Sequence, residues 1–365
     1  MAPDVTAIER IAERPIGVDP AAIEDEFARV WRETSGSGYD ESSLRLRVLN
    51  LVAIGKGPDA EDRFERVMAE LPARHPCRGI LVLLAPDATA VDALISAHCL
   101  RGPDGSLDVC SEEVTLTGPP AQQEALSSTV LALLVPEIPV AVWLMDGVDE
   151  ASYLASEAVE AADVVLGDAA AMQPPAVALR RMLAIAEEHD ASVYDLAWGR
   201  TETWRALIAQ LFDGEERVPQ LAKLREIEIE APGSRLSAEG LLVAGWLASR
   251  LGLTVADERA DERSLRATLY AGTRGVGIIV SAGGEPHARL TKVRIRTDDA
   301  EFVLAPHQEG RHVHVVERWP DHQMERMVDL PPTDDASIIT LDLGAPTEQR
   351  VYRDAARAAL ALLGA

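Results

Sequence analysis

The sequence is poor in aromatic residues, cysteines and long apolar runs. Phe, Trp and Tyr make up 4% of its 365 residues, and it has only three cysteines. A small, odd number of cysteines in a long chain does not predict a disulfide framework. The longest apolar runs, near Ile80–Ala85 and Val130–Val135, are too short to span a bilayer, and residues 1–14 lack the apolar core of a signal peptide. We therefore expect a reduced, soluble, cytoplasmic protein.

Positive charge is also scarce. The chain has 35 Lys and Arg residues against 60 Asp and Glu residues, a formal net charge of −25. Such an excess of negative charge repels nucleic acids and anionic membranes over most of the surface. We therefore expect neither a nucleic acid nor a membrane as a partner.

Patterns of known catalytic machinery are missing as well. The sequence contains neither GxSxG nor HExxH, which would indicate a serine hydrolase or a zinc protease. The glycines of Gly272–Gly277 lack the spacing of a dinucleotide-binding or phosphate-binding loop, and an ordinary turn between strands is favoured. We therefore predict no catalytic residue and no cofactor.

Two groups of residues could offer metal ligands. His312 and His314 are two positions apart, so both imidazoles would project from one face of a strand, but a solvated strand face is favoured. The adjacent His98 and Cys99, taken with Cys110, lack the paired spacing of a zinc site. Buried free thiols, Cys77 included, are the favoured alternative because cysteine packs as a small apolar residue. We predict no metal site.

Apolar residues follow the periods of both strands and helices. From Leu44 onward, strands of buried type such as Arg78–Ala85 alternate with amphipathic helices such as Gln122–Val135, which predicts a largely parallel sheet. After Gly252, short strand-like runs, the last of them Ser337–Leu343, indicate an antiparallel sheet. The predicted organisation is an N-terminal helical extension (1–43), an α/β domain (44–190) and an α+β domain with an antiparallel sheet (191–365).

Tryptophan and arginine are concentrated in one segment, DLAWGRTETWR at 195–205. Both residue types are enriched at the energetic centres of protein–protein interfaces. Trp204 falls on an apolar helix stripe and is expected in the core. Trp198 and Arg200 precede that helix and Arg205 lies off its stripe, so we predict that these three contact a partner protein or support such a contact. Packing at a domain junction is the alternative.

Arg78 and Trp143 are two further candidates for a partner interface. Arg78 lies at the start of a predicted strand, whereas ligand crevices of open α/β folds lie at the carboxyl edge of the sheet. A structural or partner-facing role is therefore favoured over a substrate anchor, and the simplest structural role is a forked pair with a buried carboxylate. Trp143 lies in another predicted buried strand, Pro139–Met145.

Six segments occur in an order that resembles one known family. They are HPCRGILVLL from His75, CSEEVTLTG from Cys110, PEIPVAVWLMDG from Pro136, ADVVLGDA from Ala162, DLAWGRTETWR from Asp195 and LLVAGWLASRLG from Leu241. Together they resemble the glucose-6-phosphate dehydrogenase assembly protein family, OpcA. The likeness runs from Leu44 to Leu253 and continues more loosely through the C-terminal region.

The resemblance implies a non-enzymatic partner of glucose-6-phosphate dehydrogenase in the oxidative pentose phosphate pathway. Such a protein would promote the active oligomer of the dehydrogenase or raise its affinity for substrate. A tenfold gain in apparent affinity needs only about 1.4 kcal/mol of coupling between the two binding events. Two other functions stay open, a sugar-phosphate-binding enzyme of the α/β class and a plain scaffold subunit, and the chain could also associate with itself.

Overall fold

The chain forms two compact units, each assembled from separate stretches of sequence. The computed structural model describes residues 6–16, 18–35, 47–101, 107–145, 152–189, 191–284, 289–307, 310–343 and 349–365. Unit 1 comprises Met1–Asp168, Glu188–Tyr194 and Asp335–Pro346, and unit 2 comprises Ala169–Glu187, Asp195–Asp334 and Thr347–Ala365. The predicted division of the chain at residues 43 and 190 stays a prediction.

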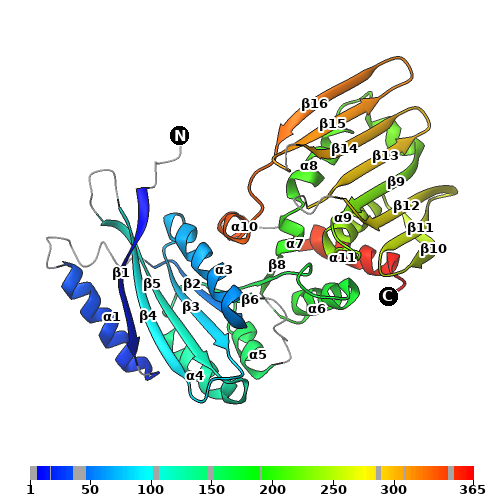
Figure 1. Ribbon diagram of the computed structural model, residues 1–365. Helices are drawn as coiled ribbons and strands as arrows, with labels where there is room; N and C mark the ends of the chain where they lie inside the picture. Colours follow the sequence, from blue (N-terminus) through cyan, green and yellow to red (C-terminus); the bar gives the residue numbers. More distant parts are fainter. Residues whose placement is uncertain are drawn as a thin grey trace. The chain divides into compact units, whose positions relative to one another are not determined.

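Unit 1 is built on an eight-stranded sheet, sheet A, with the order β1-β4-β5-β3-β2-β6-β7-β8 (Figure 1). The strands from β5 to β7 in this order are parallel, and β1 and β4 add an antiparallel edge. Every residue of β2, β3 and β6 is buried, as expected for parallel strands covered on both faces. The strands are β1 (Thr6–Ile16), β2 (Leu49–Gly55), β3 (Cys77–Leu84), β4 (Asp92–Arg101), β5 (Leu107–Gly118), β6 (Val140–Leu144), β7 (Val164–Gly167) and β8 (Ser192–Asp195).

Helices from both ends of the sequence pack in unit 1. Helix α3 packs against β2 and β3 and also against α10, while α1, α4 and α5 pack together. The N-terminal region was expected to be a helical extension. Its helix is present as α1, but β1 of the same region pairs with β4 and belongs to the sheet. The helices are α1 (Pro20–Ser35), α3 (Gly57–Glu70), α4 (Gln123–Leu133), α5 (Tyr153–Glu160) and α10 (Asp335–Asp342), with short 3-10 turns at Leu71–Ala73 (η1) and Pro120–Gln122 (η2).

The prediction of a strand at Ser337–Leu343 was wrong, because all of this stretch except Leu343 lies in helix α10. A short apolar run such as Ile338-Ile339 cannot be assigned to helix or strand from periodicity alone. Its position is decided by packing on α3, where Ile339 is fully buried and the Arg63 guanidinium lies 2.6 Å from a carboxylate oxygen of Asp335. Helix α10 therefore closes unit 1 from a point far along the sequence.

Unit 2 is built on a second eight-stranded sheet, sheet B, with the order β10-β11-β12-β9-β13-β14-β15-β16. Neighbouring strands of this sheet are antiparallel except β12 and β9, which are parallel, so the predicted fold class of an α/β region followed by an α+β region is confirmed. The strands are β9 (Leu224–Ala231), β10 (Thr254–Ala260), β11 (Ser264–Ala271), β12 (Arg274–Ala282), β13 (Lys292–Thr297), β14 (Glu301–His307), β15 (His312–Arg318) and β16 (Gln323–Asp329).

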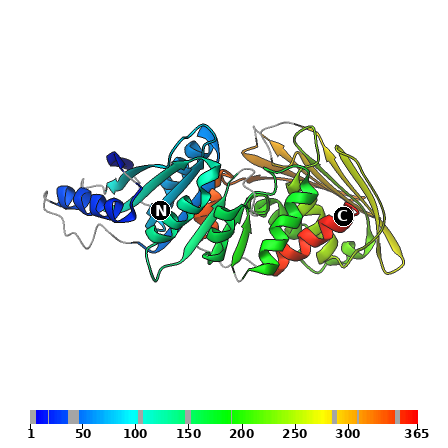
Figure 2. The same cartoon turned by 90° about the horizontal axis from the view of Figure 1, so that it is seen from below.

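Helices α9 and α11 pack against each other, and α9 lies on β9 and β12 of sheet B (Figure 1 and Figure 2). They meet at Gly245, where a Cβ atom would lie 2.1 Å from the carbonyl oxygen of Ala355 and 2.7 Å from the amide nitrogen of Ala359. Only glycine permits this approach of the two backbones. The helices of unit 2 are α6 (Pro175–Glu188), α7 (Leu196–Gly199), α8 (Glu202–Gln210), α9 (Ala238–Arg250) and α11 (Gln349–Leu362), with a 3-10 turn at Val218–Lys223 (η3).

Candidate functional site

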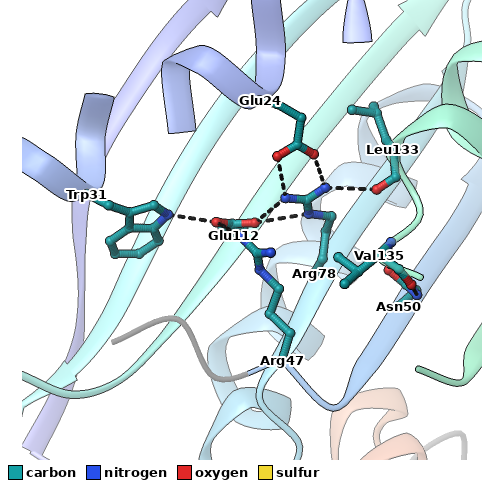
Figure 3. Close-up of polar contacts among 8 residues, drawn as sticks. All are labelled: Glu24, Trp31, Arg47, Asn50, Arg78, Glu112, Leu133 and Val135. Carbon is teal, nitrogen blue, oxygen red and sulfur yellow. Dashed lines mark hydrogen bonds and ion pairs between the residues drawn. The ribbon is translucent and has the colours of Figure 1, made fainter. Parts of the chain in front are cut away.

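Arg78 is the centre of a buried polar network at the amino ends of the parallel strands in unit 1 (Figure 3). Only 2% of its surface is exposed. Its Nε and Nη2 donate to Oε2 of Glu112 on β5, at 3.0 and 2.6 Å. Its Nη1 and Nη2 also donate to the carboxylate of Glu24 on α1, and Nη1 donates to the carbonyl oxygen of Leu133 at 2.8 Å. The predicted forked pair with a buried carboxylate is confirmed.

Glu112 accepts hydrogen bonds from three different parts of unit 1. Its Oε2 accepts from Arg78. Its Oε1 accepts from Arg47 and from Nε1 of Trp31 on α1, the latter at 2.7 Å. Burial by itself raises the pKa of Glu112, but the charges of Arg78 and Arg47 outweigh it and hold that pKa below its usual value. Glu112 is therefore charged at neutral pH, and its hydrogen bond from Trp31 ties helix α1 to the sheet.

The pKa of Arg78 is raised for the complementary reason. Burial alone lowers it, whereas the charge of Glu112 and the hydrogen bond to Glu24 together more than offset that effect. A cation–π contact adds to the network, since the guanidinium carbon lies over the Phe27 ring, 5.5 Å from its centroid. The charge of Arg78 and that of Glu112 are both balanced by partners inside unit 1. We therefore interpret the network as a structural clamp.

Trp143, the other candidate in unit 1, is completely buried in β6. The guanidinium carbon of Arg63 lies 5.2 Å from its ring centroid. That same arginine pairs with Asp335 of α10. A side chain with no exposed surface offers no area to a partner, so Trp143 can support an interface only by holding these elements in place.

In unit 2, the DLAW segment forms a tightly bonded corner before α8. Asp195 caps α7, and its Oδ1 accepts from the amides of Ala169 and Ala197, both at 3.0 Å. Its Oδ2 accepts from the hydroxyl of Tyr352 on α11 at 3.0 Å. Burial, followed by the charge of Asp195, raises the pKa of Tyr352 well above its usual value, so this hydroxyl keeps its proton and acts as a donor.

Trp198 packs edge-on against Tyr352, with ring centroids 5.9 Å apart, and is 8% exposed. The guanidinium carbon of Arg205 lies 3.4 Å from the Trp198 ring centroid, and its Nη1 donates to the Trp198 carbonyl oxygen at 2.6 Å. Arg200 is 6% exposed, and its Nη1 lies 3.8 Å from Oε1 of Glu239 at the start of α9. Trp204 is buried, as predicted.

These positions bear directly on the predicted partner interface. The five candidates do not form one cluster. Two of them, Arg78 and Trp143, contact other residues of unit 1, and the other three, Trp198, Arg200 and Arg205, contact other residues of unit 2. Of the five candidates, only Arg205 is half-buried; the other four are buried, so any role they have at an interface is one of support. Direct contact by Arg205 stays a prediction.

Sequence reasoning missed the partners that give these residues their positions. Glu24, Glu112, Asp195 and Tyr352 are separated from their partners by 34 to 157 residues, and no spacing rule connects them. One signal was available, because an Asp directly before a short helical segment is a typical N-cap, and that is the role of Asp195.

A second missed signal is the sequence G-x-G-x-x-A at Gly55–Ala60, between β2 and α3. Together with the strand order β5-β3-β2-β6-β7, this is the arrangement of dinucleotide-binding folds. The residues fit such a cofactor poorly. Pro58 has no N–H to donate and Asp59 adds a negative charge in the same first turn, where a pyrophosphate needs donors and positive charge. Gly55 serves packing, because a Cβ there would lie 2.6 Å from that of Ala60.

One face of sheet B carries rows of opposite charge. Glu226 and Glu228 on β9 pair with Arg296 and Arg294 on β13, and Lys292 lies 3.4 Å from Glu228. Their side chains are 19 to 44% exposed, whereas the alternate residues of the same strands are buried. This charged face is the solvent side of the sheet and is defined here by these five residues.

The remaining predicted ligand groups have ordinary partners. Nε2 of His312 lies 3.1 Å from Asp329 and Nε2 of His314 lies 3.0 Å from Glu325, on the neighbouring strand. Burial, with a smaller effect of Glu113, raises the pKa of the Cys77 thiol to about 12; the side chains of Cys99 and Cys110 lie outside the described residues. Within the described ranges, no group of three or more His, Cys, Asp or Glu residues could hold a metal ion.

The Gly272 turn is confirmed as part of the hairpin between β11 and β12, where Gly272 has a left-handed φ of 63°.

Among the helices that the structure describes, none is long and apolar enough to cross a membrane.

Solved structures share the fold at low sequence identity. An aldose–aldose oxidoreductase from Caulobacter crescentus, complexed with glycerol, matches with a TM-score of 0.50 and 11% identity, over 87% of this chain and 97% of that chain. A likeness at this level concerns the fold alone.

Family comparisons are more specific. Residues 68–184 match the model of the N-terminal domain of a glucose-6-phosphate dehydrogenase subunit, and residues 191–356 match the model of its C-terminal domain. An OxPP cycle protein OpcA from Synechocystis sp. is 26% identical over 69% of this chain and 53% of its own length; another from Nostoc punctiforme is 29% identical over 51% and 40%. The chain thus spans about half the length of the curated relatives it matches. The chain belongs to the OpcA family of glucose-6-phosphate dehydrogenase assembly proteins.

Proposed function

We propose that this protein is a non-catalytic assembly factor that binds glucose-6-phosphate dehydrogenase and promotes its active oligomer. The observation that carries the proposal is the pair of family matches, one on each side of residue 190, to the two domains of a glucose-6-phosphate dehydrogenase subunit. The poor fit of the Gly55–Ala60 turn to a dinucleotide supports a role other than hydride transfer.

The geometry supports a rigid binding surface. The Asp195–Arg205 corner is fixed by the Asp195 hydrogen bonds and by the stacking of Arg205 on Trp198. Such pre-organisation lowers the entropy lost on binding. By linkage, a protein that binds one state of the dehydrogenase more tightly shifts it toward that state, without contributing any group to the reaction.

The test combines co-purification with kinetics. The full chain and the dehydrogenase of the same host are mixed, their complex is measured by size-exclusion chromatography, and kcat and KM are determined with and without the chain. We expect a complex and a changed KM or kcat. A complex with unchanged kinetics selects the plain scaffold, and absence of a complex contradicts the proposal.

Arg205→Ala then tests the predicted contact at the corner. Arg205 is half-buried and its loss exposes the Trp198 ring, so we expect weaker binding to the dehydrogenase with little change in fold. Arg350→Ala is the matched control, because the Arg350 side chain is 91% exposed and belongs to neither cluster. Equal affinities of the two variants would remove Arg205 from the interface.

A further inference from the structure

An apolar pocket of about 290 Å³ opens in unit 2, between helices α8 and α9 and the face of sheet B on which α9 lies. Its floor includes Ile227 of β9 and Ile295 of β13, which are at most 1% exposed. Phe212, just after α8, and Leu247 of α9 form further walls, and both are buried. The volume is at the lower end of the range typical of ligand pockets, which favours one large apolar side chain over a drug-sized molecule.

The pocket is also lined by a tryptophan that remains accessible. Trp246 of α9 is half-buried, and it lies in the segment LLVAGWLASRLG, to which the clusters described above give no role. Four of the six tryptophans are buried in the units, namely Trp31, Trp143, Trp198 and Trp204. An accessible indole beside an apolar pocket is typical of the energetic centre of a protein–protein interface.

The charge at the pocket is negative. Asp213 lines it and is followed by Glu215 and Glu216 in the turn between α8 and η3, and all three are exposed. Within the part of the chain that the structure describes, none of these three carboxylates is in an ion pair. Arg250 of α9 also lines the pocket, but it pairs with Asp354 of α11. A ligand with a positive charge beside its apolar group therefore complements this pocket.

The surface around the pocket favours a protein over a small molecule. Ala209 is exposed at the pocket and lies four residues after Arg205, so both are on the same side of α8. Val218 is 52% exposed and lies one 3-10 turn before Leu221 of the pocket lining. The apolar surface thus continues outside the pocket, where a small molecule would leave it bare and a protein segment would cover it.

We propose that this pocket receives one large apolar side chain of glucose-6-phosphate dehydrogenase, from a segment that carries a neighbouring lysine or arginine. This inference rests on the proposed function and adds to it the place of contact and the chemistry of the partner segment. The apolar side chain displaces water from the pocket, and the basic residue pairs with Asp213. Arg217, at the end of the acidic turn, is held by the buried Glu317 at 3.2 Å and does not occupy that place. An apolar anchor with charges at the rim combines affinity with steering of the encounter.

Blocking the pocket tests the proposal. Ala209→Trp places an indole at its opening, and Ala361→Trp makes the same change at an exposed alanine of α11 outside the pocket. Surface plasmon resonance measures the affinity of the full chain for the dehydrogenase of the same host. We expect Ala209→Trp to weaken binding at least about tenfold, the scale of one central contact, and Ala361→Trp to leave it unchanged. Equal affinity in the wild type and Ala209→Trp overturns the pocket assignment and leaves the proposed function standing, whereas no complex with the wild type overturns both.

A charge reversal tests the basic part of the partner segment. Asp213→Lys is expected to weaken binding about fivefold, the scale of one exposed charge pair. Asp257→Lys, at an exposed position of β10, changes the net charge equally and is expected to have no such effect. Thermal melting monitors the fold, and if Ala209→Trp is unstable, Asp213→Lys decides. Equal effects of the two lysine variants overturn the proposal.

Photo-crosslinking identifies the partner segment itself. With p-benzoylphenylalanine in place of Val218, beside the pocket, mass spectrometry of the irradiated complex locates the crosslinked residues. We expect a dehydrogenase segment in which a large apolar residue neighbours a lysine or arginine. A crosslink to an acidic segment, to a second copy of this chain alone, or to nothing overturns the proposal.

Discussion

The two units use pairs of arginine and glutamate for opposite purposes. In unit 1, Arg78 and Glu112 are each 2% exposed and are joined by further partners from α1 and from Arg47. On the charged face of sheet B, the paired side chains of Glu226, Glu228 and their partners are 19 to 44% exposed. The same chemistry therefore gives a clamp in one unit and a solvated surface in the other, because burial decides what the loss of a partner costs.

The largest expected effect is that of Glu112→Gln. This change leaves the buried guanidinium of Arg78 without its main counter-charge, and breaking such a pair typically costs about 3–5 kcal/mol. Urea denaturation measures the free energy of unfolding, with Glu228→Gln on the charged face as the matched control. A loss in Glu112→Gln no larger than in the control would show that the buried network is not a clamp.

A loss of about 2–5 kcal/mol is expected for Ile339→Ala, since a fully buried isoleucine is replaced by a residue that leaves a cavity. The change acts on the contact of α10 with α3 in unit 1. Leu341→Ala on the same helix is the control, because Leu341 is 49% exposed. If both variants melt like the wild type, α10 does not contribute to unit 1 in solution.

Acid is expected to weaken unit 1 through Glu112. Its pKa is lower in the folded state than in the unfolded chain, so the unfolded state binds more protons when the pH falls below the usual glutamate pKa of about 4.3. The stabilisation is thus complete above that pH and is lost as the pH falls through the folded pKa. The free energy of unfolding measured from neutral to acid pH should fall more steeply in the wild type than in Glu112→Gln; parallel curves would contradict this.

A smaller effect, about 1.5–3 kcal/mol, is expected for Tyr352→Phe, the range for one hydrogen bond to a charged group. The change removes one hydrogen bond to Asp195, whose Oδ1 keeps its two amide donors, and leaves the ring packed against Trp198. Thermal melting with calorimetric analysis provides the measurement. A loss above about 3 kcal/mol, the upper range for one hydrogen bond to a charged group, would mean that the hydroxyl organises more of the corner than the structure indicates.

The smallest effect is expected for Glu228→Gln, at about 0–1 kcal/mol. Its arginine partner remains solvated when the pair is broken, and salt weakens what interaction there is. Unfolding at low and high salt checks this prediction, and a large salt-independent loss would remove the contrast between the charged face and the buried network.

Local patterns predicted a large part of the fold. The apolar run ILVLL gave β3 because both of its faces are covered, and the stripe that contains Trp204 gave α8. Strands β1 and β4 were missed, since charged residues such as Glu9, Arg10 and Arg101 interrupt their apolar pattern at the edge of sheet A. Periodicity can be seen within one segment of the sequence. The pairing of an edge strand depends on a second strand elsewhere in the chain, so the segment itself does not reveal it.

The candidate site was predictable in kind and not in its partners. A forked pair for Arg78 follows from its chemistry and its place at the start of a strand, but the choice of Glu112 and Glu24 depends on how β5 and α1 fold back. Trp198 was predicted to contact a partner protein or to support such a contact; it is packed against Tyr352 and Arg205. Such contacts between distant residues exist only once the whole unit has folded.

The position of helix α10 in the sequence constrains how unit 1 folds during synthesis. During synthesis the chain emerges from its amino end, and domains generally fold as they appear. Helix α3, on which α10 packs, belongs to the first fifth of the sequence, whereas α10 is translated near the end. The contact between α3 and α10 can therefore form only after almost the whole chain has been synthesised.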